Sequence, residues 1–209
     1  MKHQKTSGSC WGVCATGDKV ICATDKGIEF RNSDLGLENK INAPGSFDSA
    51  QATSKGGLAT KVYFSLKGTH CTYIGTEDDP SGTLIHKVKY EGGAYASHMS
   101  ATDKRIAVID YVNKQLRVYT NGGDHQFNID LIDMKWPRGV HLLPDDSAVL
   151  VTDRTGGELR KYPLTAAAKP VWGCEALDAP TGITTDEIGL IYVCGHEQKI
   201  IYMINQKGM

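Results

Sequence analysis

A repeat of 42 to 43 residues runs along the chain and constrains its fold more than any other feature. Each copy has a short apolar segment, a polar turn, a strongly apolar segment that often ends in Asp, and further apolar segments. The clear copies are residues 12–25 (GVCATGDKVICATD), 97–110 (SHMSATDKRIAVID), 139–153 (GVHLLPDDSAVLVTD) and 182–195 (GITTDEIGLIYVCG), with a degenerate copy at 47–67. The strongly apolar segments end at positions 25, 67, 110, 153 and 195, so the intervals are 42, 43, 43 and 42 residues. Unrelated segments would rarely keep this spacing, and we interpret the chain as a repeat protein.

The pattern inside each copy predicts three or four short β-strands. Leu116 and Val118 alternate with polar residues as in a half-buried strand, and Gly-rich pairs such as Gly156-Gly157 mark turns. No long segment has the period of an amphipathic helix. We expect third strands at 27–30, 70–74, 115–119, 158–162 and 199–204, and outer strands at 38–41, 83–90, 126–131 and 171–175.

A four-stranded sheet of about 42 residues cannot bury its own faces. Radial stacking of such sheets covers the faces and leaves only short edges, which predicts an all-β β-propeller with about five readable four-stranded blades. We assign residues 9–209 to the propeller, with repeats near 9–45, 46–92, 93–135, 136–178 and 179–209, and residues 1–8 to a polar N-terminal segment. A row of separate β-sandwiches is the structural alternative.

Two of the repeats resemble the NHL repeat, whose pattern is Pro-x-Gly-Ile, an acidic turn and an Ile-Tyr-Val-type strand. The matching segments are WPRGV at 136–140 with LVTD at 150–153, and APTGI at 179–183 with IYV at 191–193. Residues 110–119 (DYVNKQLRVY) match the second half of the pattern, which continues into an Arg-Ile-x-Val-type strand. The resemblance implies a propeller that recognises proteins or RNA, as at the C-terminus of tripartite-motif (TRIM) proteins. No Cys and His spacing supplies the RING or B-box zinc modules of that family, so we expect no ubiquitin-ligase chemistry in this chain.

The blade count leaves two interpretations open. Family propellers commonly have six blades, whereas five repeats are readable here, and the last is legible only as far as its third strand. The chain is therefore interpreted as a five-bladed or incompletely closed propeller, or as a fragment of a six-bladed ring. Residues 1–8 (MKHQKTSG) are polar and short, so they are a poor candidate for the missing strand.

Charge and cysteine usage favour a cytoplasmic protein without a strong global field. The chain has 23 Lys and Arg against 24 Asp and Glu, which gives a net charge of −1. Electrostatic attraction of nucleic acid would therefore require a local basic surface. The N-terminus lacks the apolar region of a signal peptide, and no 18-residue apolar run predicts a membrane span. The six cysteines form no CxxC pair, and most have β-branched or aromatic neighbours, which predicts free, buried thiols.

Candidate binding residues lie in two sets of loops that share one rim of a propeller: the loops between blades and the turns between second and third strands. Trp, Tyr and Arg are the usual anchors of interfaces, and loops of repeat proteins often bind ligands. The predicted ligand-binding rim consists of Lys26, Lys67, Tyr95, Tyr111, Lys114, Trp136, Arg138, Arg154 and His196. Packing between blades is the alternative role for Trp11, Phe47, Trp136 and Tyr95.

The remaining motifs favour structure over chemistry. Asp25, Asp110 and Asp153 recur at strand ends, where an Asp typically accepts backbone N–H groups of the following turn. His98 and His141 lie on first strands, but the one-residue insertion puts them out of phase, and a third histidine is missing, so we predict no metal site and no cofactor. No nucleophile motif is visible, so we predict no catalytic residues.

Three functions follow as hypotheses. The first is a non-enzymatic module that binds a protein partner, in the manner of a TRIM-like family member lacking its RING. The second is an RNA-binding propeller, in which rim lysines and arginines supply a local basic face. The third is a propeller lyase or hydrolase with a metal in its central channel.

Overall fold

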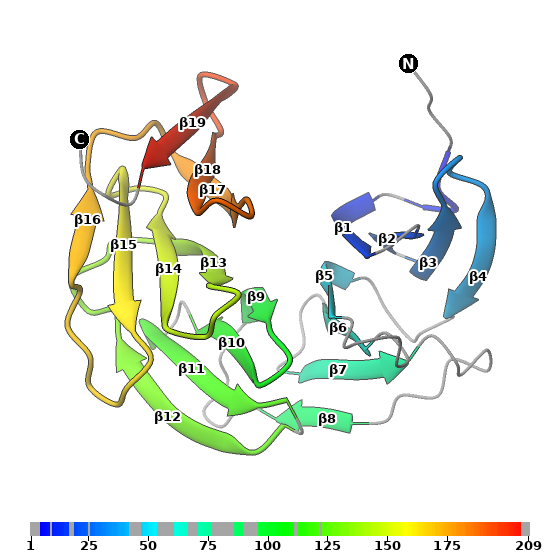
Figure 1. The fold of residues 1–209 in the computed structure, drawn as a ribbon, viewed down its shortest axis with the longest axis horizontal. Helices are drawn as coiled ribbons and strands as arrows, with labels where there is room; N and C mark the ends of the chain where they lie inside the picture. The colour runs from blue at the N-terminus through cyan, green and yellow to red at the C-terminus, as the bar shows by residue number, and fades with distance from the viewer. Residues whose placement is uncertain are drawn as a thin grey trace.

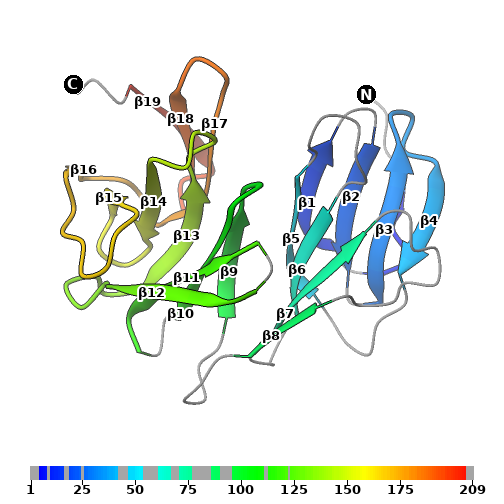
Figure 2. The ribbon, with the colours of Figure 1, turned by 60° about the horizontal axis from the view of Figure 1, so that its bottom comes forward.

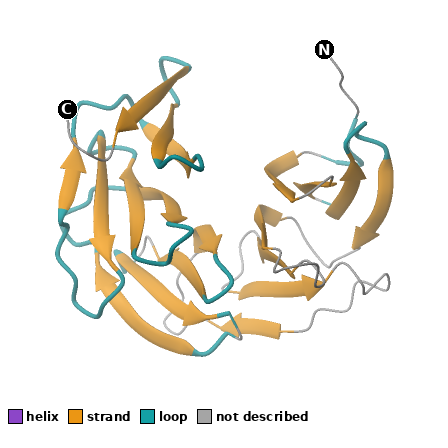
Figure 3. Ribbon diagram, viewed as in Figure 1, coloured by secondary structure: helices purple, strands orange, loops and turns teal. Residues whose placement is uncertain are grey.

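The computed structural model describes residues 5–8, 10–16, 19–24, 26–41, 47–53, 61–66, 71–76, 86–89, 96–110, 113–121 and 123–205. Strands and loops make up this part of the chain (Figure 3). Within the same residues, no helix has the length and apolar character needed to cross a membrane.

The described strands form five antiparallel sheets that follow one another along the chain. The first sheet contains β1 (Cys10–Thr16), β2 (Lys19–Thr24), β3 (Gly27–Asn32) and β4 (Leu37–Ile41). The second contains β5 (Phe47–Thr53), β6 (Lys61–Leu66), β7 (Cys71–Thr76) and β8 (His86–Lys89). The third contains β9 (Ala96–Ala101), β10 (Arg105–Asp110), β11 (Gln115–Thr120) and β12 (His125–Asp130).

The last two sheets differ in the number of described strands. The fourth contains β13 (Pro137–Leu142), β14 (Ala148–Asp153), β15 (Glu158–Pro163) and β16 (Trp172–Cys174). The fifth contains three strands, β17 (Pro180–Thr185), β18 (Leu190–Gly195) and β19 (Ile200–Asn205). In every sheet the strand order follows the chain order, which is the simple up-and-down connection that short turns permit.

The sheets are arranged radially. The first strands, β1, β5, β9, β13 and β17, lie nearest the centre and pack one against the next, and the outer strands lie at the periphery (Figure 1). The first and last sheets do not lie side by side in either Figure 1 or Figure 2, so the described sheets form an arc. Residues 5–8 lie against the first sheet, where Arg31 Nη2 donates to the Lys5 carbonyl at 2.9 Å.

Burial decreases from the second strand to the outer strand of a sheet. All six residues of β14 are buried, because neighbouring sheets cover both of its faces. β11 and β15 contain both buried and partly buried positions, and β12 exposes three of its six residues. Continuous apolar second strands and alternating third strands are therefore the sequence signature of sheets that stack face to face.

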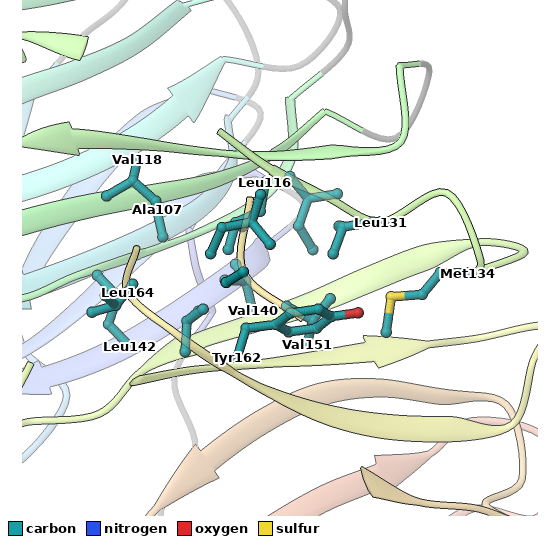
Figure 4. Close-up of a cluster of buried hydrophobic side chains, with 14 residues drawn as sticks. Ala107, Leu116, Val118, Leu131, Met134, Val140, Leu142, Val151, Tyr162 and Leu164 are labelled. Carbon is teal, nitrogen blue, oxygen red and sulfur yellow. The ribbon is translucent and has the colours of Figure 1, made fainter. Parts of the chain in front are cut away.

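Two apolar layers hold the last three sheets together. The layer between the third and fourth sheets contains Leu116, Leu131, Val140 and Val151, whose side chains point toward one another (Figure 4). The layer between the fourth and fifth sheets contains Leu150, Leu159, Ile191 and Val193, among others. At about 25 cal/mol per Å² of apolar surface removed from water, these layers are the main stabilising contribution to the stack.

The thiols follow the prediction only in part. The described cysteine side chains, those of Cys22, Cys174 and Cys194, are free thiols, and the first two are buried. Cys194 is exposed, which corrects the expectation of a buried thiol at this position. It lies on the face of β18 that points away from the fourth sheet, and among the described elements no sheet covers that face.

Candidate functional site

Backbone hydrogen bonds bring the two predicted sets of loops together at one end of the sheets. Leu131 N donates to the Lys114 carbonyl at 2.8 Å, and Leu177 N donates to the Gly157 carbonyl at 2.9 Å. These bonds join the loop after an outer strand to the turn between the second and third strands of the same sheet. We call this surface the loop rim, formed by residues 113–115, 131–136, 154–157, 175–179 and 196–199.

A buried carboxylate organises the rim in the fourth sheet. Asp153 is fully buried, and its side chain accepts hydrogen bonds from Lys135 N, from Trp136 N at 2.7 Å and from Gly156 N at 2.9 Å. One carboxylate therefore holds the inter-sheet loop and the following turn in place at the same time. Hydrogen bonds to an ionised acceptor are stronger than neutral ones, so this arrangement is rigid.

Asp110 has the corresponding role in the third sheet. Its carboxylate accepts from Asn113 N at 3.1 Å and from Arg117 Nη2 at 2.8 Å. The structure thus shows strand-end carboxylates bound to backbone N–H groups of the following turn. Asp25, the third member of the predicted series, lies outside the described residues.

The fifth sheet lacks the strand-end carboxylate, because Gly195 takes its position. A Cβ at Gly195 would lie 3.1 Å from the Asp178 carbonyl and 2.9 Å from a side-chain carbon of Ile200, so the site is tightly filled. Here the hydroxyl of Tyr202, from β19, accepts the hydrogen bond of Asp178 N at 2.8 Å. Asp178 corresponds to Lys135 one repeat earlier, so a tyrosine on the third strand replaces the missing aspartate.

Trp136 is an exposed aromatic residue of the rim. Its side chain is 39% exposed, and the guanidinium carbon of Arg154 lies 5.1 Å from its ring centroid. The Arg138 guanidinium carbon lies 6.0 Å from the same centroid. Both are cation–π distances, worth about 0.5–2 kcal/mol each depending on exposure. We call these three side chains the Trp136 platform.

A β-bulge positions Arg138 beside the tryptophan. The pairing of β13 with β14 shifts register between Pro137 and Val140, which leaves Arg138 and Gly139 out of the ladder. The freed N–H of Gly139 donates to Thr152 Oγ1 at 2.8 Å, and this hydroxyl donates to the carbonyl of Thr181 in the next sheet at 3.0 Å. A bulge next to a loop typically re-aims a side chain, as it does here.

Gly139 is required by the close approach of two first strands. A Cβ at this position would collide with the Thr181 carbonyl on β17 and would lie 2.6 Å from Thr152 Oγ1. The glycine of the WPRGV segment therefore has a packing role, and it allows the adjacent sheets to meet directly beneath the Trp136 platform.

The other predicted rim residues are found as follows. Lys26 and His196 are exposed, Lys114 is partly buried, and His196 N donates to the Ala179 carbonyl at 3.2 Å, as Arg154 N does to the Trp136 carbonyl at 2.9 Å. Lys67, Tyr95 and Tyr111 lie outside the described residues, as do the side chains of Trp11 and Phe47. Lys135, which the sequence interpretation missed, is exposed beside Trp136; its loop position was the available signal.

His141 faces the neighbouring sheet. Its Nε2 lies 3.0 Å from Thr185 Oγ1 on β17, and burial lowers the pKa of the imidazole to about 4. The side chain of His98 lies outside the described residues. Among the described side chains, no three His, Cys, Asp or Glu residues gather closely enough to hold a metal ion.

The opposite end of the fourth and fifth sheets contains a cavity of about 550 Å³ that the sequence interpretation did not predict. Its lining includes Asp145, Lys161 and Asp186. Between the third and fourth sheets the equivalent turns are tied by an ion pair of Arg105 with Asp146. One repeat later, Ala148 takes the position of Arg105 and cannot form this ion pair. The corresponding turns of the fourth and fifth sheets line the cavity instead.

Comparison with known proteins agrees with this architecture. No family model matches the chain, and no curated protein matches it. Among solved structures, a streptogramin B lyase matches with a TM-score of 0.77 and 15% identity over 96% of this chain and 66% of that one. A virginiamycin B lyase from Staphylococcus aureus matches with a TM-score of 0.73 and 14% identity over 96% of this chain and 68% of that one. The structure of BBS1N in complex with ARL6DN matches with a TM-score of 0.68 and 14% identity over 91% of this chain and 62% of that one.

These neighbours are β-propellers. The chain is a β-propeller. The propeller described here spans about two thirds of the length of the solved structures that it matches. At identities near 15% the likeness establishes the fold alone, so the function of the propeller has to be inferred from its own rim.

Proposed function

We propose that this propeller is a non-enzymatic binding module whose loop rim recognises a protein partner. The observation that carries the proposal is the exposed Trp136 ring, which lies within cation–π distance of two guanidinium groups on a hydrogen-bonded loop. Aromatic and arginine side chains dominate the energetics of protein interfaces, and a fixed scaffold reduces the entropy lost on binding. The propeller BBS1N, which is crystallised with ARL6DN, is a protein of this fold in complex with another protein.

We further propose that the propeller is of the NHL type and serves as the recognition domain of a cytoplasmic, TRIM-like protein. The support is the sequence pattern, in which WPRGV and APTGI each precede an acidic turn and an apolar second strand. The tight packing of Gly139 against Thr181 supplies a physical reason for the glycine of that pattern.

Charge reversal on the rim tests the proposed function. Immobilised wild-type chain is incubated with a nuclease-treated cytosolic extract, retained proteins are identified, and the interaction is remade with the purified partner. The variant Lys114→Glu/Arg154→Glu should lose the partner, while Lys169→Glu, which changes an exposed residue away from the rim, should retain it.

Thermal unfolding of the same variants separates recognition from folding. We expect the melting temperatures of the rim variant and of Lys169→Glu to stay within about 2–4 °C of wild type, as is usual for surface changes. Unchanged partner capture by the rim variant would overturn the proposal, and so would a melting drop that accounts for the loss. Capture of a protein from an untreated extract, but not from the nuclease-treated one, would favour RNA as the ligand.

A metal-dependent lyase is the second candidate, because two of the structural neighbours are named as lyases. His141 on β13 is the described histidine of the first strands, and its Nε2 already contacts Thr185 Oγ1. Metal analysis of the purified protein distinguishes the lyase from the binding module. One equivalent of a divalent metal that remains bound after dialysis would favour the lyase.

A further inference from the structure

Arg154 has binding capacity that the fold does not use. Its guanidinium lies over the Trp136 ring, and among the described residues the structure shows no carboxylate that pairs with it. A guanidinium carries five N–H donors in a planar fork that fits a carboxylate with two parallel hydrogen bonds. A cation–π contact uses none of these N–H donors as a hydrogen bond to a carboxylate would, so the fork keeps its capacity for such a ligand.

The fold holds this receptor in place before any ligand arrives. Asp153 binds the backbone N–H of Trp136, and the N–H of Arg154 binds the Trp136 carbonyl, so both polar backbone groups of the tryptophan are engaged. The Asp153 side chain also accepts from Gly156, which fixes the turn that follows Arg154. These loops are therefore already ordered without a ligand, so binding costs less conformational entropy.

The neighbouring side chains favour an acidic group flanked by apolar atoms. Arg138, in the bulge, lies over the same ring. Lys135, the residue before Trp136, is exposed and adds a third positive charge to the loop. The exposed part of the indole offers apolar surface between the positive charges. An extended peptide with an acidic side chain matches both features, because its carboxylate meets the fork and its aliphatic carbons cover the ring.

The rest of the rim disfavours a polyphosphate backbone. Asp133 and Glu197 are exposed on the same loops, and Asp178 is partly exposed. The chain as a whole has a net charge of −1. Such a surface attracts one or two negative groups locally but lacks the continuous positive field that binds nucleic acid.

We propose that the Trp136 platform is a receptor for the carboxylate side chains of an acidic peptide segment in the partner protein. This inference rests on the proposed function and specifies its ligand. Arg154 provides the bidentate contact, Trp136 provides the apolar surface, and Arg138 provides the second positive charge.

Fluorescence anisotropy with defined probes tests the receptor. The probes are a labelled peptide of alternating glutamate and glycine, the matched glutamine peptide, and a labelled oligouridylate of the same charge. We expect the wild-type chain to bind the glutamate peptide, and Arg154→Gln to weaken binding by at least about tenfold, the usual effect of losing a charged hydrogen bond. Arg154→Lys should also bind more weakly because it lacks the fork, whereas Lys169→Gln should bind as the wild type does.

The outcomes separate this inference from the proposed function. Absent binding of the glutamate peptide, equal binding of the glutamine peptide, full binding by Arg154→Lys, or tighter Arg154-dependent binding of oligouridylate would each overturn the acidic-peptide receptor. If the rim variant loses the partner from the extract but the glutamate peptide does not bind the wild-type chain, only this inference is overturned. If the glutamate peptide binds through Arg154 but no extract protein requires the rim, the proposed protein partner falls, and what stands is a carboxylate-binding site at the Trp136 platform.

Discussion

His141 shows how one residue couples the stacking of two sheets to pH. Its imidazole lies between β13 and β17 with Nε2 near Thr185, and burial lowers its pKa to about 4. The unfolded chain has an ordinary histidine pKa near 6.5, so between these values the unfolded state binds a proton that the folded state does not. The folded state therefore loses stability as the pH falls from about 6.5 to about 4.

The first prediction follows from this sign. The unfolding free energy should fall by at most about 3 kcal/mol between pH 7 and pH 4 on account of His141. His141→Gln should lose less over the same range, since glutamine does not titrate. Urea unfolding of both proteins at several pH values measures the difference. Parallel pH profiles would show that His141 is not responsible.

The turns between second and third strands share a demanding backbone geometry in the last three sheets. The equivalent residues Lys114, Gly157 and Lys199 all have positive φ, at 50°, 68° and 58°. A glycine adopts this conformation freely, whereas a lysine there costs about 1 kcal/mol or more. In the last three sheets this position is therefore left-handed whether or not the sequence supplies a glycine.

Exchanging residues at this turn position provides the second prediction. Lys199→Gly should raise the unfolding free energy by up to about 1 kcal/mol by removing the backbone strain. Gly157→Ala should lower it by more than about 1 kcal/mol, because the new Cβ would also lie 2.8 Å from the Leu177 carbonyl. Glu197→Gly, in the same turn but without positive φ, is the matched control and should not stabilise. A gain in the control equal to that of Lys199→Gly would contradict the strain argument.

At the scale of the whole molecule, equivalent positions have very different environments in successive sheets. Leu159 on β15 pairs with Thr152 and is fully buried beneath the fifth sheet. Ile201 on β19 pairs with Cys194 at the same repeat position and is 72% exposed. Met203, on the same face, is 67% exposed. A radial stack covers a face only where another sheet follows it.

The third prediction compares these two positions. Leu159→Ala should lower the unfolding free energy by about 2–5 kcal/mol, since it creates a cavity between two sheets. Ile201→Ala should change it by less than about 1 kcal/mol, because the side chain is already largely in water. Urea denaturation followed by tryptophan fluorescence measures both. A comparable loss in Ile201→Ala would show that this face is covered in solution.

Much of the architecture was predictable because it depends on local patterns. The spacing of second-strand ends predicted stacked sheets, and the alternation in segments such as 115–119 predicted their half-buried third strands. Strand-end residues such as Asp153 were expected to bind turn N–H groups, and they do. Strand periodicity and turn chemistry involve neighbours along the chain, so one sequence is enough to recognise them.

The sequence by itself therefore determined the repeat and the all-β fold, and its turn pattern indicated the loops in which Trp136 and Arg154 lie. Only the tertiary structure decided that Arg138 and Arg154 flank one exposed tryptophan, that Tyr202 replaces an absent aspartate, and that His141 is held neutral. Each of these depends on a bulge, on a bond between separate strands, or on burial by the next sheet. The contacts of Arg154 with Trp136, of Tyr202 with Asp178 and of His141 with Thr185 join residues that are well separated along the chain. A one-dimensional pattern carries no information about which of these residues meet.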